Sequence, residues 1–275
     1  KADRLSRRPA GVPKSSVKTL GVLGAGMMGA GVAHVAAAVG IDVILLDATM
    51  EQAEKGKAYS ASLLSREVER KRRTREQADA VLARIKPTVD YADLAGVDLV
   101  IEAVFEDTAI KAEVTARAAA VIPATTPFAS NTSTLPISGL AEAFERPADF
   151  IGLHFFSPVD RMPLVEVILG KKTSEATLAR ALDFVGQIRK TPIVVNDSRG
   201  FYTSRVFQTF IHEGMALLQE GVAPALIENA AKQAGMPVGP LAVTDEVTIE
   251  LPMRIVKQAE AEMGTAYKLP VSYDV

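Results

Sequence analysis

The chain has 275 residues, of which 48% are apolar and 23% charged, enough for one large domain or two ordinary ones. Its net charge of -2 gives no reason to expect nucleic acid or an anionic membrane as a partner. The absence of cysteine excludes disulfides, thiolate metal sites and cysteine nucleophiles. No apolar run reaches the roughly 20 residues that a membrane span needs, and the start has no signal-peptide core, so a secreted protein is not expected.

The first expected elements form a strand–helix–strand unit. Residues 18–23 favour a strand, residues 27–39 are rich in alanine with spaced valines, and residues 41–46 are almost wholly apolar. Such a unit within about 30 residues is a βαβ motif. The basic, proline-containing residues 1–17 before it are expected to be a linker or the boundary of a piece of a longer chain.

Strands and helices are expected to alternate through the next part of the chain. Residues 51–86 predict a helical hairpin, with Thr74 and Gln77 spaced to cap its second helix. Further strands are expected at 97–101, 127–130, 150–154, 165–169 and 191–195, and helices at 108–120, 137–144 and 175–188. This alternation predicts an α/β fold, a doubly wound Rossmann domain over residues 18–199 with a mainly parallel sheet.

The character of the sequence changes after Gly200. Helical spacing of apolar residues continues at 201–218, 223–234 and 241–263, and no strand pattern appears. We therefore expect an all-helical second domain over residues 200–275 that contributes to substrate binding and dimerisation.

A glycine-rich turn between the first strand and helix predicts a dinucleotide site. Residues 24–29 satisfy G-x-G-x-x-G in the required strand–turn–helix context, and an aspartate ends the next strand. Its carboxylate can bind the adenosine ribose hydroxyls and would repel a 2′-phosphate, which favours NAD over NADP. The cofactor-binding residues expected here are Gly24, Gly26, Met27, Met28, Gly29 and Asp47.

One of the three histidines is placed for chemistry. His154 ends a predicted strand, where doubly wound sheets bind ligands, whereas His34 and His212 lie on helices and are expected to be structural. Glu166 interrupts an apolar strand, and a buried carboxylate needs a partner. A His–Glu pair could take the proton of an alcohol while NAD takes the hydride; an exposed, unrelated Glu166 is the alternative.

Several segments together resemble 3-hydroxyacyl-CoA dehydrogenases. In chain order they are residues 24–29, Ile101-Glu-Ala-Val-Phe-Glu106, Ser130-Asn-Thr-Ser-Thr-Leu135, His154-Phe-Phe-Ser-Pro158 with Glu166, and Asp197-Ser-Arg-Gly-Phe201. The match covers about residues 18–239 and looks most similar to the dehydrogenase portion of the multifunctional fatty-acid oxidation α-subunit. It implies NAD-dependent oxidation of (3S)-3-hydroxyacyl-CoA to 3-ketoacyl-CoA in β-oxidation, in a bacterial cytoplasm or an organellar matrix.

The resemblance also implies roles by position. His154 would be the general base and Glu166 its orienting partner, while Ser133 would bind the substrate's 3-oxygen. Glu106 and Asn131 would line the nicotinamide end of the cofactor site. The backbone at Ala103 and Val104 would run beside the cofactor, and Lys55 matches a lysine that meets the CoA phosphates in some members. A solvated helix lysine is the other reading of Lys55. The basic run Lys71-Arg72-Arg73 is expected to be a solvated helix face, with a role in holding the CoA phosphates as the alternative.

The chain departs from the family pattern at two site positions and in length. Ser204 stands where the family often has an asparagine that binds the 3-oxygen, and Ser157 replaces the commoner asparagine after His-Phe-Phe. The resembled α-subunit has a hydratase domain before its Rossmann domain and a second helical repeat after the first, so we expect these 275 residues to correspond to a part of such a protein. A single helical unit would expose apolar surface without a partner, so we expect a homodimer or membership of a fatty-acid oxidation complex.

Two competing functions stay open at this stage. A β-hydroxyacid dehydrogenase acting on small free acids would use a catalytic lysine of the helical domain, for which Lys232 and Lys257 are the candidates. A non-catalytic module that binds NAD or acyl-CoA within a larger complex is the other alternative.

Overall fold

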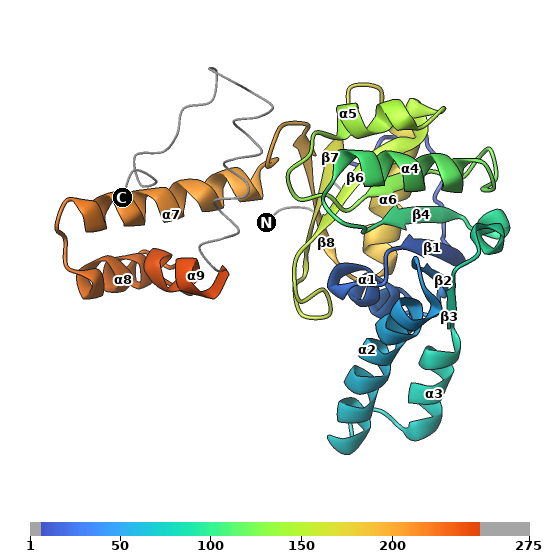
Figure 1. Ribbon diagram of the computed structural model, residues 1–275, viewed down its shortest axis with the longest axis horizontal. Helices are drawn as coiled ribbons and strands as arrows, with labels where there is room; N and C mark the ends of the chain where they lie inside the picture. Colours follow the sequence, from blue (N-terminus) through green and yellow to red (C-terminus); the bar gives the residue numbers. More distant parts are fainter. Residues whose placement is uncertain (1–6, 248–275) are drawn as a thin grey trace. The chain divides into compact units, whose positions relative to one another are not determined.

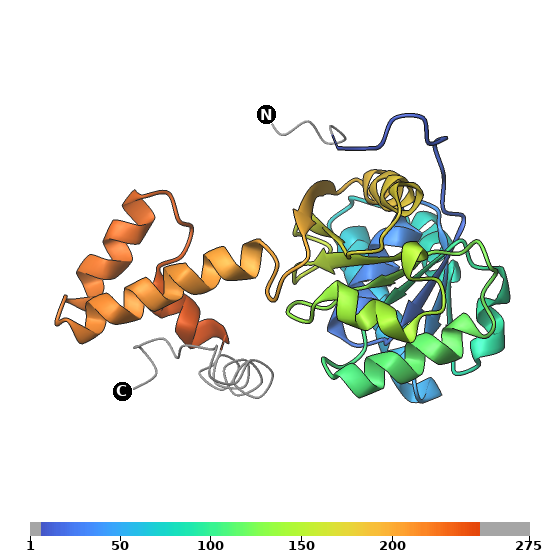
Figure 2. The same ribbon diagram turned by 90° about the horizontal axis from the view of Figure 1, so that it is seen from above.

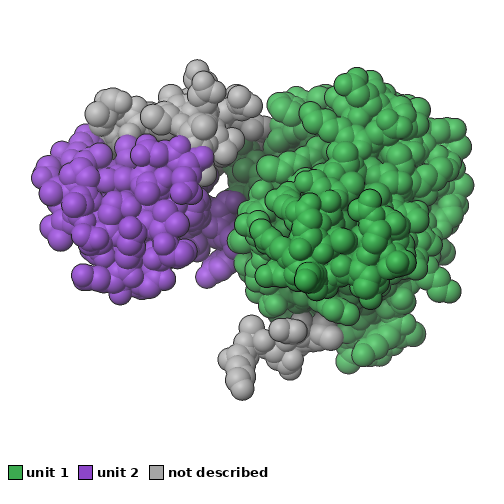
Figure 3. Space-filling view, turned by 90° about the horizontal axis from the view of Figure 1, so that it is seen from below, with its two compact units in different colours: residues 1–201 green, residues 202–275 purple. Residues whose placement is uncertain are grey.

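The computed structural model of the chain describes residues 7–247. The chain divides between Phe201 and Tyr202 into two compact units, coloured separately in Figure 3. Each unit is described by itself.

The first unit is built on an eight-stranded sheet with the order β3-β2-β1-β4-β5-β6-β7-β8 (Figure 1). The strands are β1 (Thr19–Leu23), β2 (Asp42–Leu46), β3 (Ile85–Thr88), β4 (Leu99–Glu102), β5 (Phe128–Ser130), β6 (Phe150–Phe155), β7 (Leu164–Leu169) and β8 (Thr191–Asn196). All neighbouring pairs are parallel except β6 and β7. The order reverses between β1 and β4, which is where doubly wound folds bind dinucleotides. The predicted fold class is confirmed.

Helices cover both faces of the sheet and bury two apolar clusters. One face carries α1 (Met27–Ala38), α2 (Met50–Glu69), α3 (Arg75–Ala83) and α6 (Glu175–Gln187). The other carries α4 (Thr108–Ala119) and the short α5 (Ile137–Leu140). Figure 2 shows α4 (green) and α6 (gold) on opposite sides of the sheet. Covering both faces explains why the central strands are apolar at almost every position.

Polar side chains set the starts of the helices. Thr74 and Gln77 form the expected capping box at the start of α3. Asp107 accepts hydrogen bonds from two backbone amides at the start of α4, and Ser174 accepts one at the start of α6.

Two features differ from the expectations. The last two residues of the predicted hairpin, 85 and 86, belong to strand β3 rather than to a helix. Lys86 and Pro87 hide the apolar pattern of this strand at the sheet edge. The segment before β1 does not behave as a free linker in its described part. Arg8 forms an ion pair with Asp183 of α6 at 2.7 Å, and Ser15 donates a backbone hydrogen bond to the same carboxylate.

The described part of the second unit contains α7 (Thr203–Gln219), α8 (Pro224–Gln233) and α9 (Pro240–Val247). Gly214 of α7 lets Pro240 approach closely, and Glu228 of α8 accepts the first backbone amides of α9. The expected helix at 241–263 lies outside the described residues beyond Val247. Among the described residues, no helix is long and apolar enough to cross a membrane.

Candidate active site

His154 and Glu166 face each other across the antiparallel strands β6 and β7. They are direct partners in the register of the two strands, and His154 Nδ1 lies 2.7 Å from Glu166 Oε2. The Glu166 side chain is fully buried, and that of His154 is 9% exposed. Since the carboxylate engages Nδ1, it orients the ring and leaves Nε2 for another partner. Phe156 and Phe201 flank the imidazole and exclude water from it.

The glycine-rich turn has the geometry of a pyrophosphate cradle. Gly24 has φ +92°, and a Cβ there would lie 2.7 Å from the Ala103 carbonyl oxygen. A Cβ on Gly29 would lie 1.8 Å from the Gly24 carbonyl oxygen, so both positions require glycine. Nothing lies within 4 Å of a Cβ placed on Gly26, whose backbone is open to the cleft. This turn therefore fits a phosphate group at the start of α1.

Asp47 connects the turn to the end of β2. Its Oδ2 accepts a hydrogen bond from Ala25 N at 2.6 Å, and its Oδ1 accepts one from Ala48 N at 2.6 Å. A carboxylate oxygen can accept more than one hydrogen bond, so the group retains capacity for ribose hydroxyls. Asp47 thus shapes the turn as well as offering the expected acceptor.

A cleft of about 720 Å³ runs over the carboxyl ends of β1, β2 and β4. Seven of the expected cofactor residues line it, namely Gly24, Gly26, Met27, Met28, Asp47, Ala103 and Val104. Gly29 lies beneath the turn and does not line it. The cleft is also lined by Gln52, Tyr91 and Arg117, which were not expected from the sequence. The Arg117 guanidinium lies 4.2 Å from the centre of the Tyr91 ring. No motif marks these residues, because they come from separate elements.

Glu106 anchors the loop that carries Ser133. Its Oε1 accepts hydrogen bonds from Thr132 Oγ1 at 2.6 Å and from the Ser133 backbone amide at 3.0 Å. Burial opposes ionisation of the Glu106 carboxyl, but the Lys111 ammonium and these hydrogen bonds outweigh it and hold its pKa below the ordinary value. In its ionised form, the Glu106 carboxylate thus holds the Ser133 loop in place.

Asn131 joins the same loop to the strand of the histidine. Its Oδ1 accepts the backbone amide hydrogen of Phe155, the residue after His154, at 2.9 Å. Glu106, Asn131 and Ser133 are therefore brought together with the end of β6, although neither Glu106 nor Asn131 lines the cleft.

A buried lysine holds the loop between β6 and β7, a contact that the sequence did not indicate. Lys190 Nζ donates to the carbonyl oxygens of Val159 and Met162 at 2.5 and 2.6 Å. Burial lowers the pKa of Lys190, against the opposing effect of Asp160. In the same loop, the Ser157 hydroxyl lies 3.5 Å from Met27 Sδ at the glycine-rich turn. The loop after the histidine therefore meets the start of α1.

One expected site residue lies apart from this group, and another belongs to the second unit. Lys55 is exposed on α2 and lines a smaller cavity beside the turn, together with Ala25, Asp47 and Tyr59. Ser204 lies near the start of α7 in the second unit, which is described by itself.

Arginines gather around a separate cavity of about 410 Å³ between α1, the end of α2 and the β6–β7 loop. Its lining includes Arg66, Arg70, Arg72, Arg73, Arg161 and Arg189. Arg73 pairs with Glu67 at 2.8 Å, whereas Arg70, Arg72 and Arg189 have no ion pair among the described residues. The buried His34 also lines the cavity, its Nδ1 has no hydrogen-bond partner within the described chain, and burial lowers its pKa.

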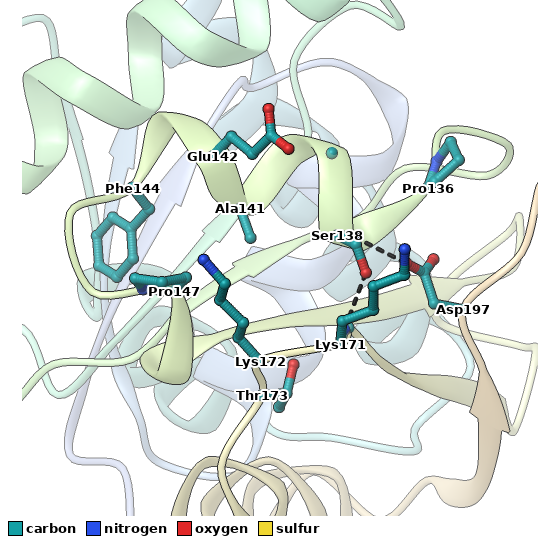
Figure 4. A pocket seen from close by; sticks show the side chains of 12 residues that line it. Pro136, Ser138, Ala141, Glu142, Phe144, Pro147, Lys171, Lys172, Thr173 and Asp197 are labelled. Atoms are coloured by element: carbon teal, nitrogen blue, oxygen red, sulfur yellow. Dashed lines mark hydrogen bonds between the residues drawn. The ribbon is translucent and has the colours of Figure 1, made fainter.

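Another cavity, of about 710 Å³, lies between α5, the turn after β7 and Asp197 (Figure 4). Asp197 accepts the backbone amide hydrogens of Ile137 and Ser138, which holds α5 in place. The turn after β7 lies at the opposite end of that strand from the β6–β7 loop, and none of the expected site residues lines this cavity. It is therefore separate from the histidine site.

Comparison with known proteins agrees with this geometry. Residues 19–198 match the NAD binding domain of 3-hydroxyacyl-CoA dehydrogenases, and residues 200–273 match their C-terminal domain. The fatty acid oxidation complex subunit alpha of Shewanella baltica is 40% identical over 265 residues, which are 96% of this chain and 38% of the relative. The chain thus spans well under half of the length of the curated relatives it matches.

Solved structures give the same result. The (S)-3-hydroxybutyryl-CoA dehydrogenase of Ralstonia eutropha superposes with a TM-score of 0.88 at 35% identity, covering 94% of this chain and 93% of that one. The 3-hydroxybutyryl-CoA dehydrogenase of Escherichia coli K12 gives 0.86 at 33% identity, covering 90% and 53%. The expected resemblance and the NAD cofactor are confirmed at the level of the family. The chain belongs to the 3-hydroxyacyl-CoA dehydrogenase family.

Proposed function

We propose that the chain is a (3S)-3-hydroxyacyl-CoA dehydrogenase that oxidises 3-hydroxyacyl-CoA to 3-ketoacyl-CoA in fatty-acid β-oxidation. The observation that carries the proposal is the buried His154–Glu166 hydrogen bond of 2.7 Å at the end of β6. Oxidising an alcohol requires a base for the hydroxyl proton, and a carboxylate-oriented imidazole supplies one. NAD, when bound, accepts the hydride that leaves C3.

The remaining steps belong to side chains of this chain. His154 Nε2 takes the hydroxyl proton, and Glu166 stabilises the imidazolium that results. Ser133 holds the substrate's 3-oxygen, and Ser204 of α7 is proposed as a second donor to it. Glu106 and Asn131 keep the Ser133 loop and the end of β6 together through the bonds described above. The two aromatic rings beside His154 keep water from the reacting atoms.

Turnover of acetoacetyl-CoA with NADH, followed at the nicotinamide absorbance, tests this function. The reduction is the reverse of the proposed oxidation, so it uses the same residues. His154→Gln should lose turnover by a factor of about 10² to 10⁴ while its NADH Kd stays within about twofold. Near-normal turnover of the variant would remove His154 from its role, and a wild-type chain that binds NADH without turnover would be the non-catalytic module.

The arginine cavity supports a CoA substrate. CoA carries phosphates at its adenosine end, and guanidinium groups bind phosphate by paired hydrogen bonds. Arg70 and Arg72 are available for this because no carboxylate pairs with them among the described residues. Lys71 of the basic run does not line the cavity. We assign the CoA phosphates to this arginine cavity rather than to Lys55.

Substrate truncation tests the assignment. Arg70→Gln/Arg72→Gln should raise the KM for acetoacetyl-CoA several-fold, with a weaker salt dependence, and leave acetoacetyl-pantetheine unchanged because it lacks the adenosine phosphates. Arg75→Gln is the matched control, since Arg75 is 69% exposed on α3 outside the cavity. Equal effects on both substrates would contradict the assignment.

The second unit supports an assembly of the chain with a partner, and the bacterial relatives support a cellular location. Six apolar side chains of the described second unit are exposed: Val206, Phe207, Leu217, Leu218, Leu226 and Met236. They suit contact with a second copy of the chain or with another part of an oxidation complex, and relatives named as complex subunits support a bacterial cytoplasmic site. Among the alternatives, nothing favours a lysine mechanism: Lys232 is exposed on α8, and Lys257 lies outside the described residues.

A further inference from the structure

A buried group of charged side chains lies behind the Ser133 loop. Lys111 Nζ lies 3.1 and 3.0 Å from the two carboxylate oxygens of Glu102, and 3.3 Å from Glu106 Oε2. The Glu102 and Lys111 side chains are 1% and 2% exposed. The Ser130 hydroxyl also donates to Glu102 Oε1. Two carboxylates and one ammonium leave this group, called the Glu102 cluster, with one net negative charge.

The Glu102 cluster borders the expected nicotinamide side of the cofactor cleft. Glu102 ends β4, and Ser130 ends β5, on the far side of the β1–β4 reversal from Asp47. A dinucleotide bound across that reversal has its adenosine over β2, because Asp47 binds the ribose there. Its other half then extends over β4 and β5. Val104, whose backbone amide donates to Glu102 Oε2, lines the cleft itself.

A net charge at this place discriminates between the two redox states of the cofactor. The oxidised nicotinamide ring is cationic and the reduced ring is neutral, so only the oxidised ring is attracted by a negative group. A buried site screens such an attraction much less than the surface does.

We propose that the Glu102 cluster sets the relative affinity for oxidised and reduced cofactor, with Glu102 and Lys111 as positioning residues that need not touch the ligand. Glu102 supplies the excess negative charge, and Lys111 limits it to one unit. The inference rests on the proposed function for the identity of the cofactor only. It concerns cofactor binding in the absence of substrate, so it stands or fails independently of dehydrogenase turnover.

Charge variants make the proposal testable through the Kd of NAD⁺ and of NADH, measured by titration calorimetry on the full chain at pH 7. Glu102→Gln neutralises the cluster and should lower the ratio of the NADH Kd to the NAD⁺ Kd about tenfold. One elementary charge acting through an effective dielectric of about 20 produces that change over roughly 12 Å. Lys111→Met removes the ammonium and should raise the same ratio, by less than tenfold where one of the two carboxyls takes up a proton in response.

The double variant separates charge from structure. Glu102→Gln/Lys111→Met restores a single negative charge, and its Kd ratio should return to within about threefold of wild type although its packing is altered more than in either single variant. Asp79→Asn, on exposed α3, removes one carboxylate elsewhere and should leave the ratio unchanged.

The proposal fails if both single variants shift the ratio in the same direction, or if both cofactors weaken by the same factor in each. Circular dichroism establishes that each variant is folded before the titration. If Glu102→Gln does not fold, Lys111→Met is compared with wild type instead, and a Kd ratio that stays the same or falls contradicts the proposal.

Discussion

Glu166 lies opposite His154 in the strand register, so replacing one of its carboxylate oxygens by an amide group can prevent the imidazole from accepting a proton. With Glu166→Gln, the amide can donate to Nδ1, and the ring proton then moves to Nε2, where it blocks acceptance of the substrate proton. We expect kcat to fall by about 10² or more with little change in the NADH Kd. Stopped-flow turnover and a cofactor titration measure the two quantities. Retained kcat would mean that Nε2 is not the proton acceptor.

The lowered pKa of Glu106 predicts that the folded chain loses stability at acidic pH. Its pKa in the folded chain lies below the ordinary 4.5, so the ionised form is preferred in the folded state. The stabilisation is fully present above the unfolded-state pKa and is lost as pH falls through the lower folded-state pKa. Thermal unfolding from pH 7 to pH 3 should show wild type more stable than Glu106→Gln at pH 7, with the gap closing below about pH 4.5. A gap independent of pH would show that packing, not charge, accounts for it.

The elements α1 and the β6–β7 loop meet at a contact that only glycine permits. A Cβ on Gly31 would lie 2.7 Å from Val159 Cβ. Gly31→Ala should therefore lower the free energy of unfolding by about 1–3 kcal/mol, because the overpacked contact must move. Val159→Ala in the same chain removes Cγ2, which would lie 2.8 Å from the added Cβ, and should recover part of the loss although Val159 Cβ remains. A double-mutant cycle in urea measures the coupling, and additive effects would refute the contact.

The elements were predictable where one local pattern decided them. The βαβ start, the Thr74–Gln77 capping box and the placement of His154 and Glu166 on strands all follow from nearby residues. Strand β3 was not predictable, because Pro87 interrupts its pattern and its pairing partners in β2 lie 42 residues earlier in the chain. The position of β7 was predicted, but only pairing in space made it antiparallel to β6.

Two buried lysines near the site could not be predicted from the sequence, again because their partners are distant in the chain. A lysine in a helix or at its end has the pattern of a solvated side chain, yet Lys111 and Lys190 are buried. Their acceptors lie on other elements: a carboxylate of β4 for Lys111, and loop carbonyls about 30 residues away for Lys190. Periodicity reports which face a residue occupies and gives no information on such long-range partners.

At the scale of the whole molecule, the second unit has too little apolar burial of its own among its described residues. In α7 only Gly214 is buried, and Val206 and Phe207 on the same helix are 53% and 40% exposed. Leu226 on α8 is 62% exposed. A helix with one apolar face is stabilised mainly by covering that face, so we expect a partner that covers these side chains to stabilise the unit.

Self-association of the chain is the corresponding prediction. Sedimentation velocity at micromolar concentrations should give a dimer for the wild type, since burying these side chains removes apolar area from water. Leu226→Glu places a charge in the contact and should shift the species to monomer, with a lower Tm for the second unit. Met50→Glu is the control, because Met50 is 43% exposed at the start of α2 in the other unit. A wild-type chain that stays monomeric over the whole concentration range would leave these side chains for another component of an oxidation complex.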